Sequence, residues 1–445
     1  MITTKEAEAL FLQGEFGKSF DALRVLATDE NDGRAQFLLS MFYFYGILVP
    51  EDNDQFGEYI DKAANAEEPL AFLFLIFMRE KSKEQVEAYR DLMKVLRDMA
   101  KENDAFAMYQ IGIMYERGLG VKADMEKALA WFEKAGNLGL AMAMVEAGKL
   151  YGNEELPFSD AHQSYLWYLK GAGLGYHEAE LHLGDCYYVG FGVDEDVQKA
   201  EICFQRAAEH GSTEACDALG TMYILGDGDA PDFDKALEYF QQGALVGDAN
   251  CCYKLGDCYF YGRGTPVDLD SAKEWYERAW DLGSAAAAAS LGMLHIIHST
   301  SEEVDDQARD EEQALGFQWV QKAADAGDVN GMAYLGNCYA EGIGVEPDEE
   351  KAKTYLTEAA NEGQIEAISK LGELALQEGN HFEAVKQFRE AADQGYPRAE
   401  NFLGICYAEG LGVQRNLRSA EEWFRRSDAQ GDPDARVLMK EYLKI

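Results

Sequence analysis

A glycine-centred motif recurs along most of the chain, and its spacing constrains the fold more than any other feature of the sequence. The clearest copy is Leu183-Gly184-Asp185-Cys186-Tyr187. Its central glycine, here called the anchor glycine, returns at intervals of 36 residues, apart from one interval of 44 and one of 32. Self-similarity at such a period indicates an array of stacked structural repeats. The anchors are Gly112, Gly148, Gly184, Gly220, Gly256, Gly292, Gly336, Gly372 and Gly404.

Each repeat has the pattern of two helices joined by a short loop. The apolar residues of the first helix follow the helical period and not the alternation of a strand. A carboxylate or amide residue stands twelve positions after the anchor, where it is expected to cap the second helix. These N-cap candidates are Asp52, Asp124, Asp160, Asp196, Asp232, Asp268, Asp348 and Asn416. Glycines able to adopt a left-handed conformation are expected to end most second helices. They are Gly139, Gly175, Gly211, Gly247, Gly283, Gly327, Gly363, Gly395 and Gly431.

The repeat period divides the chain into three parts. Residues 1–32 have the pattern of an N-terminal helical hairpin, residues 33–431 form the repeat array, and residues 432–445 provide a C-terminal capping helix. The longest interval contains an acid-rich insertion at 299–312, which we expect to be an exposed acidic loop. The shortest interval has a tighter turn at 377–380, and this repeat resembles a tetratricopeptide unit.

The motif as a whole resembles the Sel-one-like repeat (SLR) family, which is related to the tetratricopeptide repeat. The elements that carry the resemblance are Leu-Gly-x-x-Tyr, Gly-x-Gly-Val, the capping Asp, Lys-Ala, Lys-Ala-Ala and the final Gly. The predicted fold is all-α, an α-solenoid of about twelve antiparallel helix pairs. The resemblance implies that the solenoid is a right-handed superhelix. It also implies an adaptor or scaffold role in protein complexes, for example in bacterial signalling, envelope stress or host interaction.

The charge balance indicates which partners the chain would favour. With 81 acidic and 40 basic residues the net charge is −41. Such a field repels nucleic acids and anionic membranes, and it favours a protein or peptide partner of basic character. The eight cysteines form no CxxC pair, and the N-terminus lacks the features of a signal peptide. No apolar run approaches the roughly 20 residues that span a bilayer. We therefore expect a cytoplasmic protein without a disulfide framework.

No motif in the sequence indicates catalysis, a metal or a cofactor. The segment Gly17-Lys18-Ser19 ends like a phosphate-binding loop, but Leu12 occupies the position of the required first glycine. His295 and His298 are spaced to share one helix face, yet further ligands with suitable spacing are missing. We predict no catalytic residues, no metal and no cofactor.

Specificity is expected on the first helices, at positions that face away from the buried stripe. They lie two before, one after and five after each anchor, and in a helical superhelix they line the concave wall. The partner-binding candidates are His182, Asp185, Thr221, Leu225, Lys254, Asp257, Tyr261, Tyr334, Asn337 and Glu341. The first two repeats carry apolar residues there, which are Leu38, Met41, Tyr45, Phe74 and Phe77. Such a patch indicates either a partner or subunit contact, or internal covering through tighter curvature or a docked N-terminal hairpin.

The sequence favours a non-catalytic adaptor that binds its partner on the concave face. Two other functions stay open. One is an acidic inhibitor or immunity-type protein that sequesters a basic protein. The other is a penicillin-binding or β-lactamase-like activity, which some secreted members of the SLR family with paired cysteines have been linked to. Cys203 and Cys216 do not reproduce that pairing, which argues against this activity.

Overall fold

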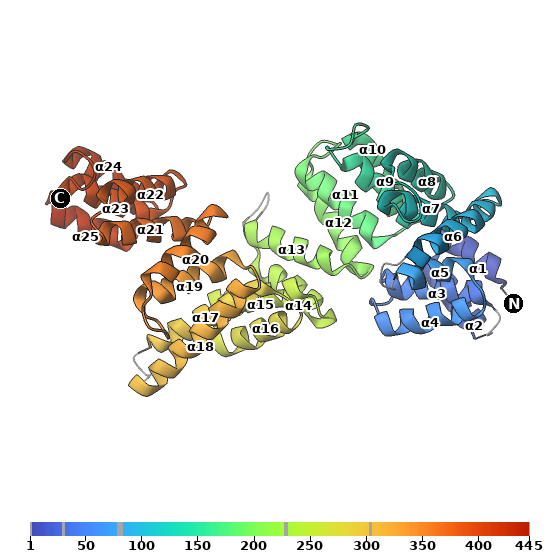
Figure 1. The fold of residues 1–445 in the computed structure, drawn as a ribbon, viewed down its shortest axis with the longest axis horizontal. Coiled ribbons are helices and arrows are strands. Elements are labelled where there is room, and N and C mark those ends of the chain that lie inside the picture. Colours follow the sequence, from blue (N-terminus) through green and yellow to red (C-terminus); the bar gives the residue numbers. More distant parts are fainter. Residues whose placement is uncertain (1, 29–31, 78–82, 227–229, 302–304, 445) are drawn as a thin grey trace. The chain divides into compact units, whose positions relative to one another are not determined.

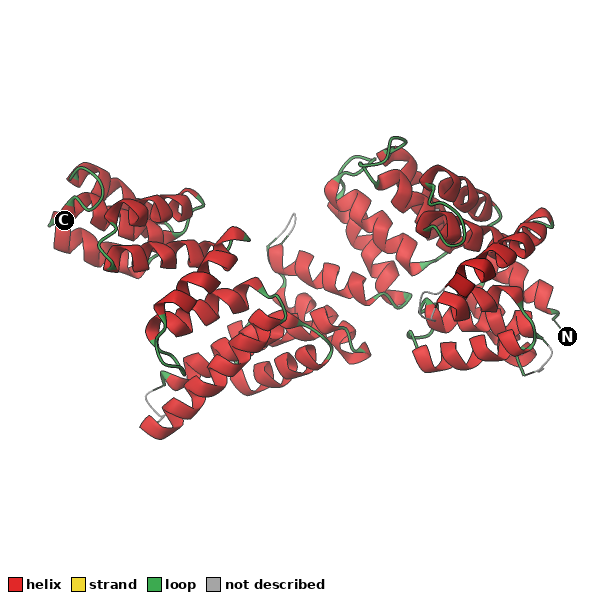
Figure 2. Cartoon of the chain, viewed as in Figure 1, coloured by secondary structure: helices red, strands yellow, loops and turns green. Residues whose placement is uncertain are grey.

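The structure is a computed structural model that describes residues 2–28, 32–77, 83–226, 230–301 and 305–444. Every regular element in these ranges is a helix (Figure 2). Consecutive helices pair into hairpins, from α1 with α2 to α23 with α24, and the described residues hold twelve such hairpins (Figure 1). The predicted all-α solenoid of about twelve helix pairs is therefore confirmed.

The chain divides into two compact units, Met1–Val246 and Gly247–Ile445. The first unit contains α1 (Thr4–Leu12), α2 (Phe16–Leu26), α3 (Gly33–Phe44), α4 (Asn53–Asn65), α5 (Pro69–Phe77), α6 (Lys83–Lys101), α7 (Ala105–Arg117), α8 (Met125–Asn137), α9 (Ala141–Gly152), α10 (Ala161–Ala172), α11 (His177–Val189), α12 (Val197–Glu209), α13 (Thr213–Leu225) and α14 (Phe233–Val246). The second unit contains α15 (Ala249–Tyr261), α16 (Leu269–Asp281), α17 (Ala285–Ser299), α18 (Asp306–Asp325), α19 (Val329–Glu341), α20 (Glu349–Asn361), α21 (Ile365–Gln377), α22 (His381–Asp393), α23 (Pro397–Glu409), α24 (Leu417–Ala429), α25 (Pro433–Leu438) and a terminal π-helical turn, Met439–Leu443.

The helix boundaries are fixed by the capping residues that the sequence predicts. Each of the eight N-cap candidates accepts a hydrogen bond from the backbone N–H three residues further on, as Asp196 does from Lys199 at 3.0 Å. The nine terminating glycines all have φ between 74° and 103°. In the two degenerate repeats Glu67 and Asn103 adopt the same left-handed conformation, with φ of 60° and 63°. The loop geometry thus persists where the glycine has been replaced.

The anchor glycines allow the two helices of a hairpin to approach closely. A Cβ atom at Gly184 would lie 2.5 Å from the ring of Phe204, and one at Gly220 would lie 2.4 Å from the ring of Phe240. Since real Cβ contacts are not this short, only glycine fits at this packing distance. The second helix fills the space with a large side chain, which is Phe in most hairpins.

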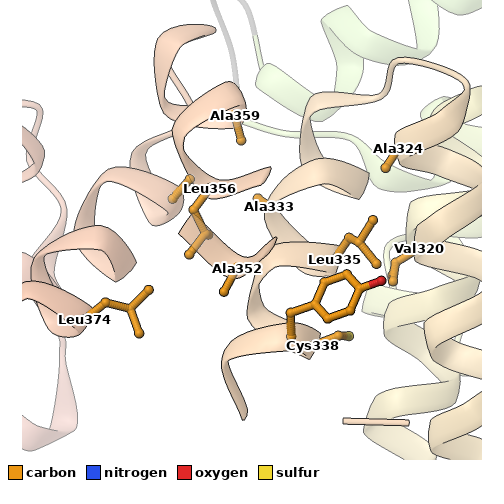
Figure 3. Close-up of a cluster of buried hydrophobic side chains, with 11 residues drawn as sticks. Val320, Ala324, Ala333, Leu335, Cys338, Ala352, Leu356, Ala359 and Leu374 are labelled. Atoms are coloured by element: carbon orange, nitrogen blue, oxygen red, sulfur yellow. The ribbon is translucent and has the colours of Figure 1, made fainter. Parts of the chain in front are cut away.

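Small and apolar side chains fill the interior between successive hairpins. In the second unit Val320, Leu335 and Leu356 gather between α18, α19 and α20 (Figure 3). All eight cysteines are free and buried, which fits their predicted role as small apolar residues. Burial raises the pKa of the Cys338 thiol to about 12 and that of the Cys258 thiol to about 11.

The insertion after Gly292 differs from the expected loop. Residues 306–312 belong to α18, so the loop prediction is wrong there, while 302–304 lie outside the described residues. Asp305 caps the helix by accepting from the Ala308 N–H at 2.9 Å. Arg309 Nε donates to the Ser299 carbonyl oxygen at 3.2 Å, which ties the added turns to α17. The acidic run is therefore a helix extension with contacts of its own.

Candidate partner-binding surfaces

The odd-numbered helices form the inner layer of each unit. Helices of this layer contact the corresponding helix of the next hairpin. The contacting pairs are α5 and α7, α9 and α11, α17 and α19, and α19 and α21. The layer whose helices lie closest together is the concave one. The predicted partner-binding residues are on α11, α13, α15 and α19, and so they belong to this layer.

The predicted apolar patch of the first unit is largely closed. Leu38 and Met41 are buried, and Tyr45 and Phe74 are half-buried. Phe77 ends α5, and its side chain lies outside the described residues. Leu38 and Met41 therefore contribute no exposed apolar surface in the first unit.

A half-buried arginine explains how the N-terminal hairpin is attached. Arg34 Nη2 lies 2.6 Å from Glu8 Oε1 on α1 and 3.1 Å from Asp104, the N-cap of α7. Arg34 Nη1 also lies 3.5 Å from Glu68, just before α5. The guanidinium stands over the ring of Phe106 with its carbon 5.4 Å from the ring centroid. We call this group the Arg34 node, and it joins α1, α3, α5 and α7.

The end of α3 reaches across the inner layer of the first unit. The hydroxyls of Tyr45 and Tyr109 lie 2.9 Å apart, and His177 Nε2 on α11 donates to the Tyr45 carbonyl oxygen at 3.1 Å. Burial raises the pKa of Tyr45 above its usual range, so the hydroxyl stays protonated. The inner faces of α7 and α11 are thus contacted by the chain's own first repeat.

Four predicted binding residues lie further along the first unit, and three of them have local contacts, since His182 Nδ1 also lies 3.4 Å from Asp185 Oδ2. The His182 ring packs on Tyr168, with 4.9 Å between ring centroids, and Thr221 Oγ1 donates to the Asp217 carbonyl oxygen at 2.8 Å. Asp185 and Leu225 are exposed. Of these four, only Asp185 and Leu225 lie on the open surface of the first unit.

In the second unit Tyr261 and Tyr334 form the aromatic part of the inner surface. Tyr261 is 59% exposed at the end of α15, and the Arg263 guanidinium carbon lies 4.9 Å from its ring centroid. Tyr334 is half-buried and packs with Trp280 and Trp319 against small residues of α17 and α18. Burial, and then the negative charge of Glu366, raise the pKa of Tyr334. Tyr334 is thus within the influence of a carboxylate, whereas Tyr261 has a guanidinium beside its ring.

Asp257 has a structural contact that its position in the repeat does not indicate. The Tyr276 hydroxyl donates to Asp257 Oδ1 at 2.6 Å. Tyr276 occupies the place where Phe204 and Phe240 pack on their anchor glycines, so its hydroxyl needs an acceptor at the bottom of the inner surface. Burial raises the pKa of Asp257. The signal that could have identified this pair is the tyrosine in place of phenylalanine.

Asn337 and Glu341 differ in how far they are engaged. Asn337 Oδ1 is buried and receives no hydrogen bond from the described residues. Glu341 lies 2.6 Å from Lys370 Nζ, and Lys370 also contacts Glu373, which in turn lies 2.9 Å from Arg398. This ladder of charges crosses α19, α21 and α23. Sequence reasoning did not single out its members on α21 and α23, although Lys370 and Glu373 satisfy the same spacing rule.

The histidine pair is occupied within the protein. His295 is buried and its Nδ1 donates to Glu312 Oε2 at 2.6 Å, while His298 Nδ1 lies 3.4 Å from Glu312 Oε1. Across the described ranges, no cluster of three or more His, Cys, Asp or Glu side chains is arranged to hold a metal ion. The helices in those ranges also include none with the length and apolarity needed to cross a membrane.

Comparison with known proteins places these features in a family. The model of the Sel1 repeat matches nine segments, which together cover more than half of the chain: 33–66, 105–140, 141–176, 177–212, 213–248, 249–284, 285–328, 329–364 and 397–432. The crystal structure of c5321, a protective antigen of uropathogenic Escherichia coli with an SLR fold, is 26% identical. The match covers 95% of this chain and 82% of that one, with a TM-score of 0.58.

Curated relatives match over shorter stretches. The "DAP3-binding cell death enhancer 1" of Rattus norvegicus is 37% identical over 102 residues, which are 22% of this chain and 20% of that protein. The "Chitin synthase regulator SKT5" of Saccharomyces cerevisiae is 31% identical over 126 residues, 27% of this chain and 18% of that protein. The chain thus spans about a fifth of the length of these relatives. The matched repeats, together with the helical hairpins and their glycine anchors, show that the chain belongs to the Sel1 repeat family.

Proposed function

We propose that this chain is a non-catalytic adaptor that holds a protein or peptide partner against the inner layer of its second unit. Sel1 repeat proteins generally mediate protein–protein interactions. The observation that carries the proposal is the exposed ring of Tyr261 on the same inner layer as Tyr334. Aromatic side chains with a partly buried rim of polar groups are typical anchors of protein interfaces.

The same surface supports a partner of basic character. The carboxylates of Asp257 and Glu366 act on the Tyr334 hydroxyl, and the whole chain has a net charge of −41. The long-range field would speed the encounter with a cationic partner and make its rate depend on salt.

The first unit is a weaker candidate for the primary surface. The first repeat contacts the inner faces of α7 and α11 through Tyr45, and Leu38 and Met41 are buried. A partner would have to displace these contacts before it reached that layer. The second unit exposes its tyrosine without any such change.

The test compares partners captured by the full chain and by the variant Tyr261→Ala/Asn337→Ala. We expect the variant to lose most of a partner that the wild type recovers reproducibly from cells of the native organism. Phe382→Ala is the matched control, since Phe382 is a 75% exposed aromatic residue on the outer helix α22. Equal recovery by the wild type and the double variant would show that the surface is wrongly placed.

The competing functions give different results in the same material. An acidic inhibitor would bind one cationic protein tightly, and that protein would lose its activity in the complex. A role in bacterial signalling or host interaction predicts partners from those systems; the similar c5321 is itself described as a protective antigen. A penicillin-binding activity predicts covalent labelling by a β-lactam, and an unlabelled protein would exclude it.

A further inference from the structure

The hairpin formed by α21 and α22 has a shorter loop than the hairpins with a Gly-x-Gly loop, such as α11–α12 and α23–α24. In four hairpins the second glycine of the Gly-x-Gly loop packs onto the second helix of the preceding hairpin; these glycines are Gly120, Gly192, Gly344 and Gly412. A Cβ at Gly192 would lie 2.0 Å from the Ala161 carbonyl oxygen, and one at Gly412 would lie 2.2 Å from that of His381. The shorter turn after α21 has only Gly379, and a Cβ there would have no neighbour within 4 Å. The loop that would cover α20 is missing.

The same hairpin also lacks an aromatic side chain. The residue before the one that packs on the anchor glycine is aromatic in most hairpins: Trp131, Trp167, Tyr239, Trp275, Trp319, Tyr355 and Trp423. This ring packs on the preceding second helix. Trp319 lies 5.9 Å from Trp280 between ring centroids, and Trp167 would meet a Cβ at Gly136 at 2.9 Å. On α22 the position holds Gln387, and the facing residue on α20 is Ala360.

These two departures coincide with a groove between α20 and α22. Its volume is about 520 Å³, and Gln387 and Ala360 both line it. The floor is apolar and consists of Ile368, Leu371 and Ala375 on α21. The Gln387 amide does not fill the space, because its Nε2 donates along its own helix to Glu383 Oε1 at 2.9 Å. The groove is an empty form of the site that a tryptophan occupies elsewhere in this chain.

The charges at the rim indicate which kind of residue would be favoured next to an aromatic residue of the partner. Lys353 is engaged by Glu349 at 2.8 Å and by Glu378, and Lys386 lies 3.0 Å from Glu383. Glu390 lines the groove and forms no ion pair with any described residue. The rim therefore has two neutralised lysines and one carboxylate that is available to a cation.

We propose that the groove between α20 and α22 binds an aromatic side chain of a partner protein, with an adjacent basic residue paired to Glu390. The ring takes the place of the missing tryptophan against Ala360 and the apolar floor. The proposal rests on the proposed adaptor function but uses the outer layer, away from Tyr261. The adaptor would then hold partner segments on both layers of its second unit.

The binding test uses short synthetic probes with the full chain. The probes are N-acetyl-tryptophanyl-lysine amide and N-acetyl-tryptophanyl-glutamate amide, and titration is followed by NMR of the probe. We expect the lysine probe to bind more tightly, and Glu390→Gln to remove the difference between the two. Gln387→Trp should fill the groove from within, weaken the binding of both probes by at least about tenfold and raise the melting temperature. Phe382→Ala should leave probe binding unchanged.

A second filling variant keeps the test decisive if Gln387→Trp misfolds. Ala360→Leu adds bulk from the opposite wall and should also weaken binding by about tenfold. Failure of the wild type to bind either probe would overturn the proposal, as would binding that both filling variants leave intact. Neither result affects the test of the inner layer. That test depends on whether the variant Tyr261→Ala/Asn337→Ala loses its partner.

Discussion

Replacing Arg34 by methionine tests how the N-terminal hairpin is held in the first unit. The Arg34 side chain is 17% exposed, and its three carboxylate partners are between 10% and 19% exposed. Methionine keeps much of the apolar stem but removes the positive charge. Glu8, Glu68 and Asp104 would then be left close together in a partly buried site without a cation.

The expected cost follows from these contacts. Arg34 donates three hydrogen bonds, two to Glu8 at 2.6 and 3.1 Å and one to Asp104 at 3.1 Å. A charged hydrogen bond contributes roughly 1.5–3 kcal/mol, and losing one member of a buried ion pair costs roughly 3–5 kcal/mol. Water can reach the freed carboxylates in part, so we expect a loss of about 3 kcal/mol in the free energy of unfolding at neutral pH. Lys94→Met is the control, since the exposed pair Lys94–Asp91 is worth at most about 0.5 kcal/mol.

The assay combines urea unfolding with hydrogen exchange read by mass spectrometry. Exchange should accelerate in α1, α3 and the start of α7, and it should stay unchanged in the second unit. The deficit should also shrink as the pH falls. Burial raises the pKa of Glu68 and the Arg34 charge lowers it, so removing the cation raises that pKa further, and protonation of Glu68 then stabilises the folded variant. A loss below about 1 kcal/mol, or a loss independent of pH, would refute the assignment of Arg34 as an electrostatic node.

Three further predictions concern the repeat geometry. Gly220→Ala should destabilise the protein by about 1–3 kcal/mol, because the added Cβ would lie 2.4 Å from a phenylalanine ring. Gly57→Ala is the control: it has open space in α4 and should stabilise the protein by about 0.5–1 kcal/mol. Thermal unfolding compares the two variants. Burial raises the pKa of Asp257, so its ionisation costs stability as the pH rises through that raised pKa. Asp257→Asn should therefore gain stability relative to the wild type over the same rise in pH in urea titrations; an unchanged difference would contradict this. Glu312→Ala removes the partner of the buried His295 and should accelerate hydrogen exchange over 306–312, while equal exchange would show that the histidine contact does not hold the extension.

The repeat pattern could be predicted because its causes are local. Capping by Asp196 and termination at Gly211 depend on a few neighbouring residues, and each is visible as a fixed spacing in the sequence. The anchor glycine is equally readable, since its packing partner lies at a constant distance in the same hairpin. Glu67 could also be placed at a helix end, because the repeat period marks the position of the terminating residue even where that residue is not glycine.

Contacts between distant residues could not be predicted in the same way. Arg34 meets Asp104 across 70 residues, and no repeat of the period predicts that pair. The closure of the inner layer by Tyr45 and His177 spans 132 residues and depends on the curvature of the array. Acid-rich composition misled the assignment of 306–312 as a loop, because charge reports exposure and not the absence of a helix. Solvent-facing turns of a helix can be as acidic as a loop.

Departures from the repeat separate structural residues from candidate binding residues. A departure that the chain compensates itself is structural: Tyr276 brings a hydroxyl into the hairpin, and Asp257 accepts its hydrogen bond at 2.6 Å. A departure that the chain leaves uncompensated opens a site. Gln387 replaces an aromatic ring, turns its amide toward its own helix, and a groove of about 520 Å³ results.

The family model matches the repeat that contains Tyr276 but neither 67–104 nor 365–396, and the groove residues of α21 and α22 fall in the second of these stretches. On the apolar floor of the groove Leu371 is half-buried, whereas Ile368 and Ala375 are buried. The retained hairpin caps and anchor contact of Phe388 show that the rest of this unit packs as the others do. The deviation is thus confined to the surface where a ligand would bind. In a repeat protein, such a confined and uncompensated deviation is a more specific indicator of a binding site than the exposure of any single residue.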